Sequence, residues 1–305
     1  MLTLLLLLPC IVATGLFDPL SYDVTFRIPN EVEPSGSFSA SLDIHLDLPQ
    51  DTTTLVLDAV DLSAFRNVTL IDFAQPGRKH ELKGIRIMAE HVEFMQDGST
   101  GLFVRGASVY THLQPSYARR LLPCIDRPSV RTPFRVTIEH SQNTLAFSNT
   151  ASVEERTTMD STGVDGASRK RTTFSTTPAL PAYLLAISVL PDSLHQLSAS
   201  TSFGVTVRVL SFKQTSLLRV LRAALATFEY LADVIKIPLP INKLDLVLVE
   251  GYEGGMENWG HILLSSALAD TADDAHLLHI VAHEIAHHWV GNAATVRTWA
   301  HICLQ

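Results

Sequence analysis

The chain has 305 residues, 46% of them hydrophobic, so it can bury a sizeable core, and we expect more than one domain. Its formal net charge of −8, without any long basic run, argues against a nucleic-acid partner. Three cysteines, Cys10, Cys124 and Cys303, are too few for a disulfide framework.

An apolar stretch occupies residues 2–17, with small residues at Ala13-Thr14-Gly15 that suit signal-peptide cleavage. No lysine or arginine precedes the stretch, and it is shorter than the roughly 20 apolar residues of a membrane span. We favour a signal peptide at residues 1–17 over a short membrane anchor or a buried strand. We therefore expect a secretory-pathway protein, extracellular or membrane-associated. The triplet Asn67-Val68-Thr69 is a glycosylation acceptor, which agrees with entry into the secretory pathway.

Alternation of apolar and polar residues predicts strands between Tyr22 and Ile28 and between Phe38 and Leu48. Further strand-like runs are Thr54–Leu57, Val68–Phe73, Phe134–Ile138 and Thr206–Leu210. Together they predict an antiparallel β domain over residues 18–206. We interpret the polar triplet Arg169-Lys170-Arg171 as a solvated hairpin tip, with a processing site as the alternative.

After residue 206 the apolar period becomes helical. It predicts a helix from Leu217 to about Val234, ended by prolines, then a short strand at Leu244–Val249, a loop and a second helix. The order of strands first and helices later predicts an α+β protein with a second domain over residues 207–305.

The second helix carries His283-Glu284-Ile285-Ala286-His287. Residues four apart share one helix face, so both imidazoles can hold one metal ion, while Glu284 can take a proton from a metal-bound water. Apolar neighbours would bury the helix, and buried histidines need a partner. We interpret this stretch as a zinc site on a helix that a capping pair, Thr271 and Asp274, begins.

Catalytic zinc takes three protein ligands, and this helix does not supply the third. His276 and His279 also lie on it, but the run from His279 through His283 to His287 spans about 12 Å along the axis. That distance is too long for one ion.

Two other segments stand out. In Gly254-Gly255-Met256-Glu257-Asn258 the paired glycines let the backbone approach a ligand, and Glu257 could meet a cation, although Gly-Gly is also common in turns. In the segment 118–128 we favour a structural turn with Cys124 buried over a reactive thiol.

The segments "ARRLLPCIDRP", "GGMENWG" and "VAHEIAHHWVGN", in this order, resemble the aminopeptidase N family of zinc metallopeptidases, the gluzincin aminopeptidases that include the leukotriene hydrolase. The strands after residue 20 resemble the family's saddle-shaped β domain, and "PAYLLAISV" its last strand. The resemblance implies a saddle-like antiparallel β domain followed by the start of a thermolysin-like α/β zinc-peptidase domain, truncated.

The resemblance also implies residue roles. His283 and His287 correspond to ligands of one Zn2+, and Glu284 to the general base. Glu257 corresponds to the carboxylate that binds the free α-amino group of the substrate, and Gln114 to a residue that lines the first pocket and helps to hold the amine. The residues expected to pair with the substrate backbone are Gly254, Gly255, Met256 and Asn258.

The third zinc ligand of the family is a glutamate in an Asn-Glu-Gly segment. Aligning "TWAHICLQ" with the family's "TWxxxWLNEG" places that glutamate just after Gln305, with Cys303 and Gln305 in place of the usual Trp and Asn. A tyrosine that stabilises the tetrahedral intermediate is also expected further on. We therefore expect weak zinc binding and little or no activity from these 305 residues.

The favoured function is a zinc aminopeptidase that removes the N-terminal residue from peptides with a free N-terminus. The alternative is a non-catalytic peptide-binding or decoy protein that uses Glu257 without chemistry. An epoxide hydrolase is a third hypothesis, which rests only on Gly255.

Overall fold

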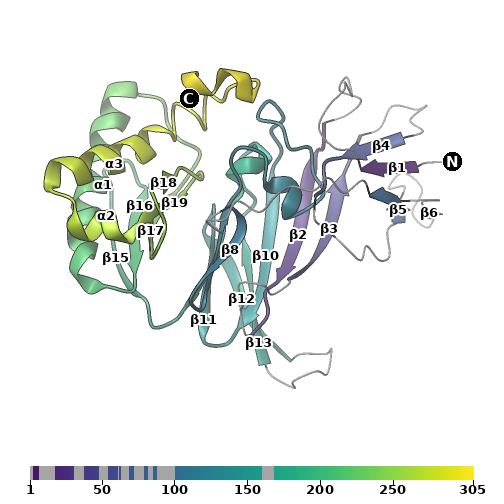
Figure 1. Cartoon of the computed structure of the whole chain (residues 1–305), viewed down its shortest axis with the longest axis horizontal. Coiled ribbons are helices and arrows are strands. Elements are labelled where there is room, and N and C mark those ends of the chain that lie inside the picture. Colours follow the sequence, from purple (N-terminus) through teal and green to yellow (C-terminus); the bar gives the residue numbers. More distant parts are fainter. Residues whose placement is uncertain are drawn as a thin grey trace.

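The computed structural model describes residues 3–6, 18–30, 38–47, 54–60, 62, 69–71, 79–81, 85–87, 100–159 and 168–305. Within them it confirms the predicted architecture: a β-rich N-terminal part, then an α/β part with the helices on one side (Figure 1). The candidate site residues all lie in the described ranges.

Two sheets build most of the N-terminal part. The first has the order β12-β13-β10-β2-β3 and contains β2 (Ser21–Arg27), β3 (Ser39–His45), β10 (Phe134–Ser141), β12 (Ser152–Met159) and β13 (Ser168–Phe174). The second has the order β11-β14-β9-β8 and contains β8 (Gly101–Arg105), β9 (Ser108–His112), β11 (Thr144–Ser148) and β14 (Ile187–Pro191). Pairing is antiparallel as predicted, except that β2 and β10 run parallel.

Shorter strands lie nearer the N-terminus. A three-stranded parallel sheet contains β1 (Thr3–Leu6), β4 (Thr54–Leu57) and β7 (Ile85–Ile87), and a two-stranded one contains β5 (Thr69–Ile71) and β6 (Lys79–Glu81). The expected cleavage site and Asn67 lie outside the described residues, so both stay predictions. No helix in the described part of the chain is long and apolar enough to cross a membrane.

The basic triplet 169–171 does not form a hairpin tip, and that prediction was wrong. It lies in β13, where Arg169 is buried and donates to the carbonyl of Ile28 and to Asn30 Oδ1 at 2.9 Å. Pairing with β10 and β12 on both sides gives these side chains partners in the sheet. The apex of the hairpin, residues 160–167, lies outside the described residues.

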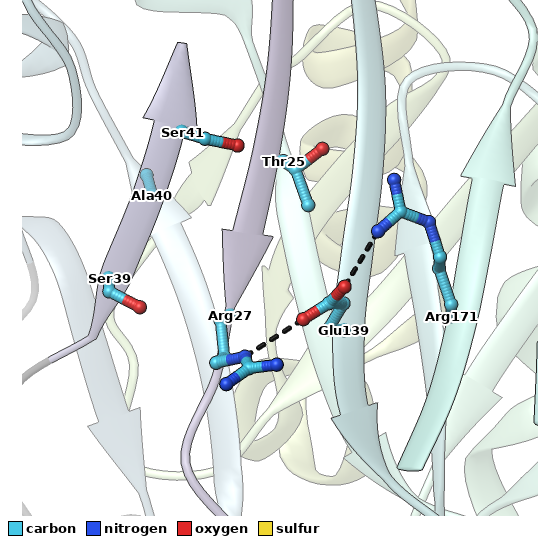
Figure 2. A pocket seen from close by; sticks show the side chains of 7 residues that line it. All are labelled: Thr25, Arg27, Ser39, Ala40, Ser41, Glu139 and Arg171. Atoms are coloured by element: carbon cyan, nitrogen blue, oxygen red, sulfur yellow. Dashed lines mark hydrogen bonds and ion pairs between the residues drawn. The ribbon is translucent and has the colours of Figure 1, made fainter. Parts of the chain in front are cut away.

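The face of this sheet that points away from the core carries a pocket of about 310 Å³, lined mostly by polar residues (Figure 2). Glu139 lies between two arginines, with Arg27 Nε at 2.8 Å and Arg171 Nη1 at 2.6 Å from its two oxygens. Although burial opposes ionisation, these guanidinium groups lower the pKa of Glu139 below its ordinary value. The ion pairs of neighbouring strands therefore account for the charge in this pocket. Its other lining residues are Thr25, Ser39, Ala40 and Ser41.

The second part is built on a sheet with the order β15-β16-β17-β19-β18. Its strands are β15 (His195–Ser200), β16 (Thr206–Ser211), β17 (Lys243–Val249), β18 (Gly255–Met256) and β19 (His261–Ser265). Since β15 and β16 pair with this sheet, it begins before the domain boundary that we placed at residue 206. The exact division into domains stays a prediction.

Helices cover one face of that sheet. They are α1 (Leu217–Ile235), α2 (Ser266–Thr271) and α3 (Asp274–Ala286). Short 3-10 turns are η1 (Ala118–Arg120), η2 (Ala182–Leu184), η3 (Gln214–Ser216) and η4 (Trp299–Leu304). The predicted capping pair was wrong, because Thr271 ends α2 and the Asp273 side chain caps α3 by accepting from the His276 amide at 2.8 Å.

Strand β17 shows how the two parts share a core. It is buried along its whole length. Leu244, Leu246 and Leu248 pack with the helices, whereas Val247 and Val249 pack with residues of the N-terminal sheets. A strand that is buried on both faces needs cover on both, and the β part supplies the cover that the helices do not. The candidate site lies at this junction.

His140, on β10, is a buried histidine of the N-terminal part. Its ring nitrogens lie 2.8 Å from Thr144 Oγ1 and 2.9 Å from Thr172 Oγ1. Burial, and next the positive charge of Lys170, lower its pKa to about 4. The folded protein therefore keeps this ring neutral at pH values where the unfolded chain has already protonated it.

We predict that His140 makes stability fall as the pH drops from 6.5 to 4. Over that window the unfolded state binds a proton that the native state refuses, which costs up to about 1.4 kcal/mol per pH unit. Urea unfolding at several pH values should show a shallower slope for His140→Gln. Thr144→Val, which removes a hydrogen bond but no titrating group, should lower stability and keep the slope. An unchanged slope in His140→Gln would contradict the assignment.

Candidate active site

The two histidines of the predicted metal pair converge. His283 lies in the last turn of α3 and His287 directly follows it with helical backbone angles, so their separation of four residues keeps them on one face. Their Nε2 atoms are 3.1 Å apart. Two imidazoles bound tetrahedrally at about 2.05 Å from one Zn2+ would have nitrogens about 3.3 Å apart. The observed spacing suits two ligands of one ion.

The orientation of His287 favours the same interpretation. Its Nδ1 lies 3.0 Å from the carbonyl oxygen of Val290, which can only accept a hydrogen bond. Nδ1 therefore carries the proton, and the lone pair of Nε2 points to His283. Metal-binding histidines are commonly fixed by such a bond from the other ring nitrogen to a carbonyl.

In the described residues, His283 and His287 are the two candidate metal ligands at this site. Within those ranges no group of three or more His, Cys, Asp or Glu side chains is arranged so that it could hold a metal ion. The residues present thus fit two positions around a zinc ion, and a third protein ligand is not among them. The sequence already argued against His276 and His279 as the third ligand, and in the described residues neither forms a metal-holding group with the pair.

Glu284 lies beside the histidine pair and is buried. Burial, and next the negative charge of Glu257, raise its pKa to about 8. Its carboxylate packs against Gly255 so closely that a Cβ on that glycine would come within 2.3 Å of Glu284 Oε1. The glycine of β18 is therefore required for α3 and β18 to approach each other at this point.

The carboxylate of Glu257 accepts hydrogen bonds from both parts of the chain. It is buried, and its Oε1 accepts from Gln114 Nε2 at 3.0 Å and from Gln305 Nε2 at 2.7 Å. Gln114 follows β9 of the N-terminal part, so the structure brings together two residues 143 positions apart. Gln305 also donates to the hydroxyl of Tyr183 at 3.3 Å.

The remaining predicted binding residues offer mainly their backbone. Gly254 is exposed, whereas the side chains of Met256 and Asn258 are fully buried. Strand β18, formed by Gly255 and Met256, is the last strand of its sheet in the described residues. Its open edge is suited to pairing with an added peptide strand. The two buried side chains face away from solvent, and the assigned roles stay predictions.

Several residues that hold the site together were not predicted from the sequence. His288 is buried, and its Nε2 accepts from the amide of Gly260 at 3.0 Å. Asn292 Nδ2 donates to the carbonyl oxygen of Glu257 at 2.7 Å, and Arg131 Nη1 donates to the carbonyl oxygen of Asn292 at 2.8 Å. His288 and Asn292 lie inside the "HHWVGN" segment, but no local pattern shows which distant atoms they meet.

The segment around Cys124 is structural, as we favoured. Cys124 is buried, and burial, followed by the charges of Asp126 and Asp58, raises its pKa well above the ordinary thiol value. Arg119 binds Asp126 through its Nε at 2.9 Å and ties the turn together. A buried thiol with a raised pKa is a poor nucleophile.

Comparison with known families gives two matches in chain order. Residues 18–184 match the peptidase M1 N-terminal domain, and residues 220–305 match the peptidase family M1 domain. The first match alone covers more than half of the chain, and the second contains the histidine pair, Glu284 and Glu257.

Individual relatives carry aminopeptidase names. Aminopeptidase Q of Mus musculus is 32% identical over 76% of this chain and 43% of its own length. The puromycin-sensitive aminopeptidase of Caenorhabditis elegans is 31% identical over 64% and 21%. Aminopeptidase M1-A of Oryza sativa subsp. japonica is 27% identical over 95% and 36%. The chain thus spans less than half the length of these relatives.

The close approach of Gly255 and Glu284 gives a double-mutant test. We expect Gly255→Ala to lower the free energy of unfolding by about 1–3 kcal/mol, because the new methyl overlaps the Glu284 carboxyl group. Glu284→Ala should abolish that cost. Gly254→Ala is the matched control. Its φ of +75° makes any side chain strained, but no atom lies within 4 Å of a Cβ there, so its cost should be equal in both backgrounds. Additive effects of Gly255→Ala and Glu284→Ala, measured by denaturant unfolding, would contradict the packing described here.

Proposed function

Because the chain belongs to the peptidase M1 family, we propose that it acts on peptides with a free N-terminus, as part of a zinc-dependent aminopeptidase. One observation carries the proposal: a buried carboxylate, Glu257, lies next to an open strand edge and on the same site as the His283–His287 pair and Glu284.

The proposed binding mode follows from these neighbours. A peptide that pairs with the edge of β18 would run toward Glu257, whose negative charge attracts a protonated α-amino group. Both amide donors to the Glu257 side chain, from Gln114 and Gln305, reach Oε1, so an arriving ammonium group would meet Oε2. A buried carboxylate at the end of the binding strand favours chain ends over internal segments.

We call Glu257 the amine clamp, and we assign the chemistry to the residues next to it. His283 and His287 would hold the metal, which when bound supplies a Lewis acid and lowers the pKa of a water molecule. Glu284, which is buried beside the pair, would accept a proton from a water molecule and pass it to the leaving amine. The donor set of the described residues fits two of the three ligands that such a site needs.

A non-catalytic peptide-binding role is the second candidate. It is supported by one observation: Glu257 is held from both parts of the chain, by Gln114 and by Asn292. In that role Glu257 selects a free N-terminus and no bond is broken. The two candidates differ in whether binding and turnover require metal.

We also propose that residues 1–17 direct the protein into the secretory pathway, supported by their apolar composition, with membrane association through this segment as the alternative. N-terminal sequencing of protein from the culture medium of expressing eukaryotic cells tests this. A mature N-terminus close to Gly15 supports it, and an intact Met1 in a cytosolic fraction would contradict it.

We predict that metal binding depends on the histidine pair. In competition with a chromophoric chelator, His283→Ala and His287→Ala should each weaken zinc binding at least tenfold, because each removes one of two donors. His279→Ala, on the same helix, should have no effect. Equal losses in all three variants would contradict the assigned pair.

Activity and binding assays on the 305-residue protein and its variants distinguish the two candidate functions. Zinc-dependent release of a fluorophore from an aminoacyl substrate, abolished by Glu284→Gln and retained by His279→Ala, supports the aminopeptidase. Binding of peptides with a free amine, without zinc and without turnover, supports the non-catalytic role. Equal affinity for free and N-acetylated peptides would overturn both.

A further inference from the structure

The proposed function requires a fixed spacing within the site. An enzyme that removes one residue must hold the α-amine one residue away from the metal-binding group, and small misplacements are costly in such sites. Here the two groups lie on different segments, since Glu257 follows β18 and His287 follows α3. A rigid connection between these two residues is therefore needed.

Asn292 makes that connection directly. Its backbone amide donates to the carbonyl oxygen of His287 at 2.9 Å, and its side-chain Nδ2 donates to the carbonyl oxygen of Glu257 at 2.7 Å. The residue is fully buried, so neither bond competes with water. Asn292 thus bonds to the backbone of both Glu257, the amine clamp, and His287 of the histidine pair.

The N-terminal part holds Asn292 in turn. Arg131, which lies between β9 and β10, donates through Nη1 to the carbonyl oxygen of Asn292 at 2.8 Å and to Thr295 Oγ1 at 2.7 Å. Thr295 Oγ1 also lies 2.9 Å from the same carbonyl oxygen. The guanidinium group stacks over Trp259 at 5.4 Å, two residues beyond Glu257. Asn292 is therefore fixed from the β part as well.

We propose that Asn292 is a positioning residue that sets the spacing between Glu257 and the His283–His287 pair. The inference rests on the proposed function. Asn292 need not touch the peptide, since its bonds go to backbone atoms of Glu257 and His287. Arg131 and Thr295 act through it. Without the Asn292 amide, the buried carbonyl oxygen of Glu257 loses this partner, and the clamp can shift relative to the metal pair.

A purely structural role for Asn292 predicts something different. Loosening the fold in general would weaken the binding of every peptide to the same degree. Loss of positioning would instead weaken the recognition of the amine and spare the contacts along the strand edge. The ratio of affinities for a free and an N-acetylated peptide therefore separates the two roles.

The experiment uses the 305-residue chain and a Leu-Gly-Gly tripeptide labelled with fluorescein at its C-terminus, with and without N-acetylation. Fluorescence anisotropy gives both affinities for the wild type and for Asn292→Ala, Asn292→Asp, Arg131→Gln and Thr295→Val. Glu257→Gln reports on the clamp itself. Asn143→Ala, in the exposed turn between β10 and β11, is the matched control.

We expect Asn292→Ala and Asn292→Asp to lower the affinity ratio about tenfold, Arg131→Gln and Thr295→Val to lower it less, and Asn143→Ala to keep it. If the buried Asn292 variants fail to fold, Arg131→Gln and Thr295→Val decide, since both act at partly exposed side chains. An unchanged ratio in these variants, with a reduced ratio in Glu257→Gln, would overturn the inference and leave the proposed function standing. An unchanged ratio in Glu257→Gln would overturn both.

Discussion

The shared core between the N-terminal sheets and the α/β sheet is the constraint on which the candidate site depends. Strand β17 is buried on both faces, and only one of those faces is covered by helices. The β part covers the other, and this brings Gln114 and Arg131 to Glu257 and Asn292. The histidine pair at the end of α3 and the carboxylate of Glu257 after β18 are linked through Asn292, which bonds to the backbone of both His287 and Glu257.

Buried charges also link the two parts at this junction. Lys243 donates to Asp245 at 2.8 Å, to the carbonyl oxygen of Gly260 at 2.8 Å and to that of Ser148 in the N-terminal part. Although burial opposes it, Lys243 and its neighbours hold the pKa of Asp245 far below the ordinary range. Across the junction, His261 Nε2 lies 2.8 Å from Ser188 Oγ. Ser188, His261 and Asp245 resemble a hydrolase triad in type, but all three are buried, so they join two sheets and do not face a substrate.

The sequence predicted the parts of this site that depend on local spacing. His283 and His287 are four apart on a helix, and this spacing alone places both nitrogens together. The capping residue was missed by two positions, since Asp273 and Thr271 are both acceptable caps and only the break between α2 and α3 decides. Gln114 was found through family resemblance, because nothing in its own segment indicates a partner 143 residues away.

The residues that fix the spacing could not be predicted in this way. Asn292 meets Glu257 across 35 residues and Arg131 across 161, and neither contact leaves a period or a motif. The prediction that the basic triplet 169–171 forms a solvated hairpin tip was wrong because a local feature, its charge, was given too much weight. Charge suggested solvent, but strand pairing on both sides supplied carbonyl and carboxylate partners that composition does not reveal.

We propose that Glu257 and the His283–His287 pair act on one peptide. Loading the protein with Co2+ and recording proton NMR spectra of a bound tripeptide tests it directly, because paramagnetic broadening falls steeply with distance from the metal. The structure predicts the strongest broadening at the first residue of a peptide with a free amine, decreasing toward the C-terminus, and its loss in His283→Ala. Equal broadening along the peptide, or broadening that is strongest at its C-terminus, would contradict a single site at this junction.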